Sequence, residues 1–226
     1  MAGMYVPDIL SLPLHRLDER TSDYSLLDDG QVQIGIWECT AGTAADPGGD
    51  YDEVMFMVSG RVSVDHADGS FDVAPGTLWA TPHGFASTWR VHQTVRKLYV
   101  IDQRAGTAGA PAHLANAYAA TLGTPTPRPV MLAGDPHESS VGLWSQNQLE
   151  TGVWNCTPGE FPFRRDGYDE VFCVLAGHAT LPVDGVGGPG QSFDLRPGSV
   201  LLTPAGLTGR WVVHETLRKA YVIVNR

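Results

Sequence analysis

Apolar positions in this chain occur in short runs, and turn residues close most of the runs. Residues 54–58 form one such run, and Ser59 and Gly60 close it, which is typical of a buried strand that ends in a turn. Residues 61–65 then alternate between polar and apolar side chains, as a half-buried strand does. Short strands separated by frequent Gly, Pro and Asp turns predict an all-β fold of the sandwich or jelly-roll type.

The same pattern occurs twice along the chain, which makes the protein a tandem duplication. The first repeated segments lie 117 positions apart, and the later ones lie 122 positions apart because the second copy holds five extra residues. The repeated segments are residues 37–42 and 154–159, 51–54 and 168–171, 71–76 and 193–198, and 89–99 and 211–221.

The segment between the two copies has a different composition. Residues 111–122 are rich in alanine, begin with proline and are followed by Gly123, which predicts a short helix. Residues 124–129 hold three prolines, which favours an extended linker. We therefore expect an N-terminal domain over residues 1–104, a helical and Pro-rich linker over residues 105–129, and a C-terminal domain over residues 130–226.

The charge and the cysteine content indicate which binding partners and which cellular compartment to expect. The net charge of −10 opposes binding to nucleic acid. No apolar run approaches the roughly 18 residues of a membrane helix, and the first residues lack the pattern of a signal peptide. Cys39, Cys156 and Cys173 have no metal-binding or disulfide spacing, so we expect reduced, buried thiols. These features predict a cytoplasmic protein with neither a nucleic-acid nor a membrane partner.

Two short motifs in each copy resemble those of the cupin superfamily. The matching segments are Glu53-x6-Gly60 and Glu170-x6-Gly177 for the first cupin motif, and Gly76-x5-Pro82-x-Gly84 and Gly198-x5-Pro204-x-Gly206 for the second. The endings over residues 89–97 and 211–219 resemble the DUF861 or cupin-3 subgroup, which includes relatives of ureidoglycine aminohydrolase. The resemblance implies a bicupin, with two double-stranded β-helix (jelly-roll) barrels. It also implies a homodimer, since cupins commonly pair through their sheets.

The resemblance stops at the metal ligands. Cupin metal sites use three histidines and one glutamate, and of these only the glutamates Glu53 and Glu170 are present. Ser87 and Gly209 stand where the second motif has its histidine. One carboxylate is a poor site for a transition metal. We expect no metal and no other cofactor, and a metal-dependent cupin with non-standard ligands is the weaker alternative.

Strand alternation predicts which side chains share a face with each glutamate. Tyr168 lies two positions before Glu170, and Asp166 and Arg164 continue the same spacing. In this arrangement Glu170 would be a general base, Tyr168 an acid or oxyanion donor, and Arg164 a clamp for a carboxylate, with Asp166 beside it. In the alternative interpretation, Glu170 and Tyr168 form structural hydrogen bonds, and Arg164 and Asp166 form a solvated pair in a loop.

The first copy repeats this glutamate and tyrosine as Glu53 and Tyr51, without an arginine or aspartate at the corresponding positions. Since residues 161–166 are charged and the following glycine loop is longer, we expect the C-terminal barrel to hold the better site. Four tryptophans occupy equivalent positions and belong either to the cores or to an aromatic wall for a planar ligand. They are Trp37, Trp89, Trp154 and Trp211.

Two classes of function fit these residues. The first is a metal-independent enzyme that uses acid–base chemistry on a small polar or carboxylated metabolite, in an isomerisation, elimination, cyclisation or C–N hydrolysis. The second is a non-catalytic protein that binds or senses a small metabolite, or that stabilises another enzyme. The fold does not decide between them, because this barrel hosts many unrelated functions.

Overall fold

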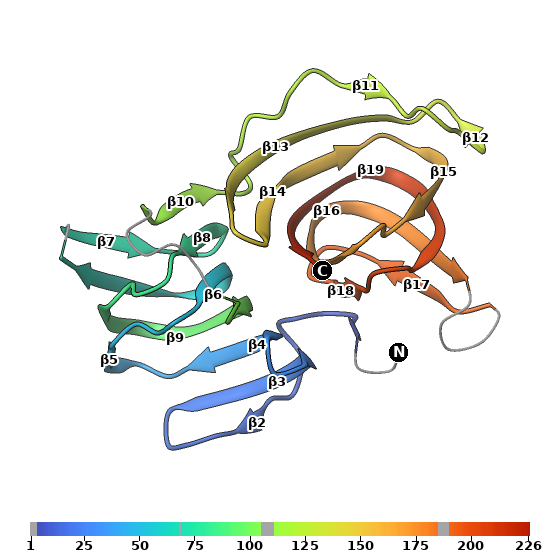
Figure 1. Ribbon diagram of the computed structural model, residues 1–226. Helices are drawn as coiled ribbons and strands as arrows, with labels where there is room; N and C mark the ends of the chain where they lie inside the picture. Colours follow the sequence, from blue (N-terminus) through green and yellow to red (C-terminus); the bar gives the residue numbers. More distant parts are fainter. Residues whose placement is uncertain (1–3, 68, 105–110, 185–189) are drawn as a thin grey trace. The chain divides into compact units, whose positions relative to one another are not determined.

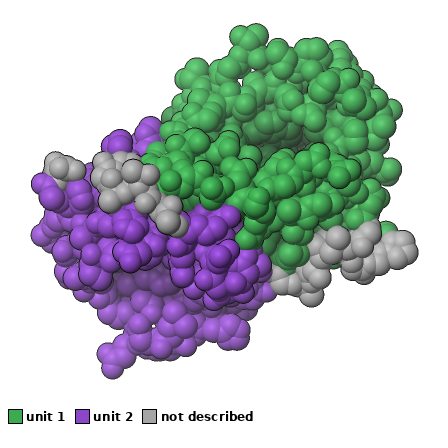
Figure 2. All heavy atoms as spheres, viewed as in Figure 1, with its two compact units in different colours: residues 1–9, 118–226 green, residues 10–117 purple. Residues whose placement is uncertain are grey.

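The computed structural model describes residues 4–67, 69–104, 111–184 and 190–226, and these residues form two antiparallel sheets (Figure 1). The chain divides into two compact units (Figure 2). We call residues 10–117 the N-terminal barrel, and residues 1–9 with 118–226 the C-terminal barrel. No helix in the described part of the chain is long and apolar enough to cross a membrane.

The N-terminal barrel is one nine-stranded sheet with the order β10-β8-β6-β9-β4-β3-β2. Strand β6 pairs with β8 through its first half and with β7 through its second, while β9 pairs with β5 and then β4. This sharing of long, bent strands rolls the sheet into a barrel. The strands are β2 (His15–Arg16), β3 (Thr21–Asp28), β4 (Val32–Cys39), β5 (Gly42–Asp46), β6 (Asp52–His66), β7 (Gly69–Val73), β8 (Thr77–Thr81), β9 (Ser87–Asp102) and β10 (His113–Asn116).

The C-terminal barrel repeats this topology, because β13 to β19 pair with one another as β3 to β9 do. Its outer edge differs: the N-terminal strand β1 pairs with β18, where β10 pairs with β8 in the first barrel. Residues 4–9 therefore lie in this unit. The strands are β1 (Tyr5–Val6), β11 (Thr126–Pro127), β12 (Ala133–Gly134), β13 (His137–Gln146), β14 (Leu149–Cys156), β15 (Gly159–Arg164), β16 (Tyr168–Asp184), β17 (Ser192–Leu195), β18 (Val200–Thr203) and β19 (Thr208–Asn225).

The helix expected over residues 111–122 is wrong, and the described residues of the chain contain no helix. His113–Asn116 form β10, and the backbone N–H of Ala117 donates to the carbonyl of Gly76 at 2.8 Å. The helix propensity of alanine is a weak effect. Backbone hydrogen bonds to the unpaired edge of a sheet stabilise the extended conformation more strongly. In the Pro-rich part of the expected linker, Thr126–Pro127 form β11, and residues 105–110 lie outside the described residues.

Each barrel has its own apolar core. Trp79 is a fully buried member of the N-terminal core and lies edge-on to Phe71, and Phe172 is a fully buried member of the C-terminal core. As expected, the three cysteines are buried and free. The N-terminal core includes Val73 of β7, and the C-terminal core includes Phe193 and Leu195 of β17.

Candidate functional site

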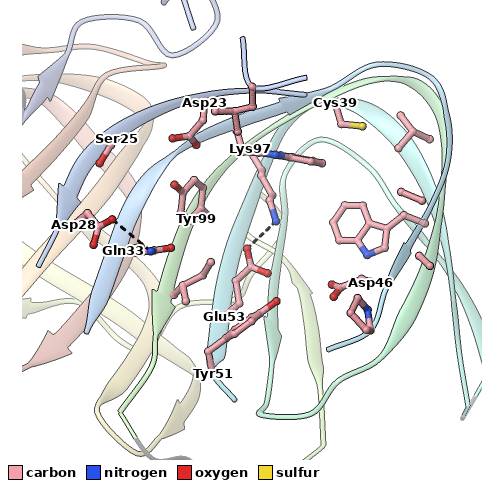
Figure 3. Close-up of a pocket in the computed structure, with 18 residues that line it drawn as sticks. Asp23, Ser25, Asp28, Gln33, Cys39, Asp46, Tyr51, Glu53, Lys97 and Tyr99 are labelled. Carbon is pink, nitrogen blue, oxygen red and sulfur yellow. Dashed lines mark hydrogen bonds and ion pairs between the residues drawn. The ribbon is translucent and has the colours of Figure 1, made fainter. Parts of the chain in front are cut away.

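The N-terminal barrel encloses a cavity of about 510 Å³, with an ion pair at its centre (Figure 3). Lys97 from β9 donates from Nζ to Oε1 of Glu53 from β6 at 2.7 Å, and both side chains are only 9% exposed. The same ammonium group lies 5.1 Å from the ring centres of Trp37 and Trp89. Aromatic faces attract cations at this distance, so Lys97 is held by a carboxylate and two indoles.

Strand register explains why these side chains meet. Trp37 on β4 pairs directly with Lys97 on β9, so both point to the same face of the sheet. Alternation then places Tyr99 beside Lys97 on that face. Gly35 leaves room for the Tyr99 ring, because a Cβ at this glycine would lie 2.7 Å from the Tyr99 hydroxyl.

The C-terminal barrel holds the equivalent pair in a smaller cavity of about 350 Å³. Lys219 from β19 forms an ion pair with Glu170 from β16, and its Nζ lies 5.1 Å from the rings of Trp154 and Trp211. Here Glu170 also forms an ion pair with Arg165. One buried carboxylate therefore serves two buried cations.

This three-membered cluster sets the protonation states of the site. Burial raises the pKa of Glu170, but the charges of Arg165 and Lys219 outweigh it, so the pKa lies below the ordinary value and the carboxylate stays ionised. Burial lowers the pKa of Lys219 to about 8, and the Glu170 charge opposes that shift only in part. The pKa of Lys219 is thus shifted toward neutral pH.

Most of the side chains predicted from the sequence line the two cavities. The predicted residues of the N-terminal cavity are Tyr51, Glu53, Trp37 and Trp89, and those of the C-terminal cavity are Tyr168, Glu170, Trp154 and Trp211. The sequence left open whether the tryptophans belong to the cores or to a cavity wall, and two of them belong to both. Trp89 and Trp211 are buried members of the cores, and each also forms part of a cavity wall.

Arg164 and Asp166 form the solvated pair that the sequence left open as an alternative to a binding site. Their side chains are 66% and 71% exposed and form an ion pair with each other, and Arg164 also lines the C-terminal cavity. Arg165 instead points inward and contacts Glu170. Strand β15 ends at Arg164, and the bend that follows, with a left-handed Gly167 at φ +77°, breaks the alternation before Tyr168.

Sequence reasoning also missed the two lysines, although the chain carried a signal for them. Lys97 and Lys219 are the only lysines among the 226 residues, and they occupy the same position in each repeat. Lysine is rarely buried unless it is paired. A lone lysine in each copy, within an otherwise alternating strand, therefore indicates a specific role in the barrel interior.

The cupin resemblance implies a metal, and the residues at the corresponding place do not fit one. The lysine ammonium group already occupies the carboxylate that would serve as ligand. At the histidine position, Ser87 accepts a hydrogen bond from Trp89, and a Cβ at Gly209 would lie 2.4 Å from the carbonyl oxygen of Pro182. Within the described ranges, no group of three or more His, Cys, Asp or Glu side chains could hold a metal ion.

Two tandem jelly-roll barrels, each with an interior cavity, define the chain as a bicupin. Residues 26–99 and 145–221 match the family model of the EutQ-like cupin domain, so the chain belongs to this family. No curated protein matches the sequence.

Solved structures resemble the chain along almost its whole length. A DUF861 protein of unknown function from Pseudomonas syringae pv. tomato is 18% identical, with 98% of each chain covered and a TM-score of 0.79. YlbA from E. coli, also of DUF861, is 10% identical, with 97% and 89% covered and a TM-score of 0.70. Oxalate decarboxylase from Bacillus subtilis is 12% identical, with 98% of this chain and 77% of the other covered and a TM-score of 0.64. At these identities the likeness shows the fold alone.

Proposed function

We propose that the protein is a small-molecule enzyme that moves a proton on a carboxylated metabolite in the C-terminal cavity, without a metal ion. The observation that carries this proposal is the buried cluster in which Glu170 is shared between Arg165 and Lys219. A cavity with more fixed positive than negative charge favours an anionic ligand. An amine with a pKa of about 8 can accept or donate a proton near neutral pH.

The side chains around the cluster have separate tasks in this proposal. Arg165 and Arg128 bind the substrate carboxylate, since both line the cavity and Nε of Arg128 is buried without a hydrogen-bond partner in the described structure. Lys219 transfers the proton. Glu170 stays ionised and positions Lys219. The general base expected at Glu170 from the sequence is therefore assigned to Lys219 in this proposal. Tyr168 remains a hydroxyl donor, and its oxygen lies 3.5 Å from Arg165 Nη1.

Of the reaction classes expected from the sequence, isomerisation and elimination remove a proton from the carbon next to a carboxylate or carbonyl, so the test follows that proton rather than a product. The protein is incubated in D2O with pyruvate, 2-oxoglutarate, L-malate or N-carbamoylglycine, and the proton next to the carboxylate or carbonyl is followed by NMR. We expect exchange of at least one probe above the uncatalysed rate, increasing as the pH rises through about 8.

Two variants make the test specific. Lys219→Met should abolish the exchange, while Lys97→Met, the same change in the other barrel, should leave it intact. Exchange that survives Lys219→Met would refute the assignment. Exchange that is lost on chelation and restored by an added transition metal would refute the metal-free mechanism.

A second candidate function is non-catalytic binding of a small metabolite, and the duplication favours it in one respect. Both barrels keep the lysine–glutamate pair, as a purely structural pair would be kept. A probe that raises the melting temperature without any exchange, and does so equally in the Glu170→Gln variant, would support this function. The homodimer and the cytoplasmic location stay predictions.

A further inference from the structure

The two cavities descend from one duplicated site, so their residues can be compared position by position. Asp23 on β3 pairs with Trp37, and Ser140 on β13 pairs with the equivalent Trp154, so aspartate in one barrel corresponds to serine in the other. By the same register, Asp28 corresponds to Ser145. The N-terminal cavity therefore has acidic residues where the C-terminal barrel has neutral ones.

Strand β5 shows the same divergence. Asp46 pairs with Ser87 on β9, and the corresponding pair in the other barrel is Phe163 with Gly209. Two positions earlier, Ala44 corresponds to Phe161. The two phenylalanines fill space that alanine and aspartate leave open, which accounts for the larger volume of the N-terminal cavity.

The C-terminal cavity, in turn, has a cationic residue where the N-terminal barrel has a neutral one. Arg165 corresponds to Gly48, two positions after Asp46. Gly48 has φ +72°, and a Cβ there would lie 2.9 Å from the backbone of Phe85, so an arginine does not fit in the N-terminal barrel. As a result, four carboxylates and one ammonium line the N-terminal cavity, whereas four cations and one carboxylate line the C-terminal cavity.

The three aspartates of the N-terminal cavity have no ion-pair partner among the described residues. The charges of Lys97 and His15 act on Asp23 from a distance, and Lys97 is itself paired with Glu53. Oδ1 of Asp23 is buried and has no described hydrogen-bond partner. Burial raises the pKa of Asp23, although a hydrogen bond with Tyr99 opposes the shift, so this carboxylate is poorly solvated.

Figure 3 shows how the charges surround the cavity. Asp23 and Asp28 come from β3 on one side, Asp46 comes from β5 on the other, and the Lys97–Glu53 pair lies between them. We propose that the N-terminal cavity binds a small organic cation, an amine or guanidinium group on an apolar body, so that the two barrels take ligands of opposite charge. The carboxylates bind the cationic group, and the tryptophan wall packs against the apolar body.

This inference is independent of the proposed function, because it rests on the acidic residues of the other barrel. Its test is calorimetric titration of the full chain with two probes of similar shape and opposite charge, 2-phenylethylamine and 3-phenylpropanoate. Agmatine serves as a guanidinium probe. Titration up to about 10 mM detects dissociation constants in the millimolar range.

Three variants locate the site. Asp23→Asn with Asp46→Asn keeps the side-chain shapes, and we expect it to raise the Kd of the cationic probes by about tenfold or more. Ala44→Phe fills the cavity as Phe161 fills the other one, and it should have the same effect without changing any charge. Asp135→Asn, at a 77% exposed position in the C-terminal barrel, removes one negative charge from the chain and should leave the Kd unchanged.

The titrations distinguish results that support the proposal from results that overturn it. Binding of a cationic probe that is weakened by the cavity variants and kept in Asp135→Asn supports the proposal. It is overturned if neither cationic probe binds, if binding is indifferent to both Ala44→Phe and the double aspartate variant, or if 3-phenylpropanoate is the probe displaced by Ala44→Phe. Melting curves of each variant without ligand identify any loss of folding, and Ala44→Phe is then judged on its own.

Discussion

Removing the carboxylate of each ion pair should damage the two barrels unequally. Glu170→Gln leaves Lys219 and Arg165 buried without their counter-ion, whereas Glu53→Gln leaves only Lys97. A lysine can lose its proton in response, but the arginine guanidinium cannot. Breaking a buried pair costs about 3–5 kcal/mol, and we place Glu170→Gln in this range and Glu53→Gln about 1–2 kcal/mol below it.

Removing the lysine should reverse the order. After Lys219→Met, Glu170 keeps Arg165 as a partner, so the expected loss is about 1–2 kcal/mol. After Lys97→Met, Glu53 has no ion-pair partner among the described residues, and the loss should approach about 3 kcal/mol. The same count of charges thus predicts a crossed pattern, in which the C-terminal barrel is the more sensitive to loss of glutamate and the less sensitive to loss of lysine.

The assay is urea unfolding at pH 7, combined with hydrogen exchange measured separately for peptides of each barrel. Hydrogen exchange gives the opening free energy of each barrel, which a single melting curve for two domains does not resolve. The reasoning is refuted if Glu53→Gln destabilises its barrel more than Glu170→Gln does, or if Lys219→Met costs more than Lys97→Met.

Further predictions concern the lysines and the glycines that shape the cavities. Burial lowers the pKa of Lys219 from 10.5 to about 8, so between these pH values the unfolded chain binds more protons than the folded one. The free energy of unfolding should therefore rise as the pH increases from about 8 toward 10. The Lys219→Met variant should remove this pH dependence in urea melts. A ¹³Cε-lysine label should give two side-chain signals, and a Lys219 midpoint above pH 10 would contradict the desolvated environment. Gly152→Ala should destabilise the C-terminal barrel by about 2 kcal/mol or more, because its Cβ would lie 2.2 Å from the Val141 carbonyl oxygen; the exposed Gly142, where a Cβ meets nothing within 4 Å, is the control, and equal melting points for the two alanine variants would contradict the steric argument.

The duplication, read from the sequence alone, determined the number of domains and the fold. Repeated glycines, prolines and tryptophans at fixed spacing identify the turns and strands of each barrel, because turn residues and alternation are local properties of the chain. The same spacing brought Glu53, Glu170 and their tyrosines to the cavities as expected. Composition misled the prediction for residues 111–122, where pairing of His113–Asn116 with β8 outweighed the helical preference of alanine.

The charge of each site was decided by tertiary structure. Asp23, Asp46 and Lys97 belong to three different strands, and they share a cavity only because the sheet closes on itself. Whether Arg164 or Arg165 reaches Glu170 depends on where β15 ends, and strand alternation carries no information across that bend. The sequence therefore contains every charged residue of the two cavities. The opposite charge of the cavities can be recognised only when strand register shows which of these residues face one another.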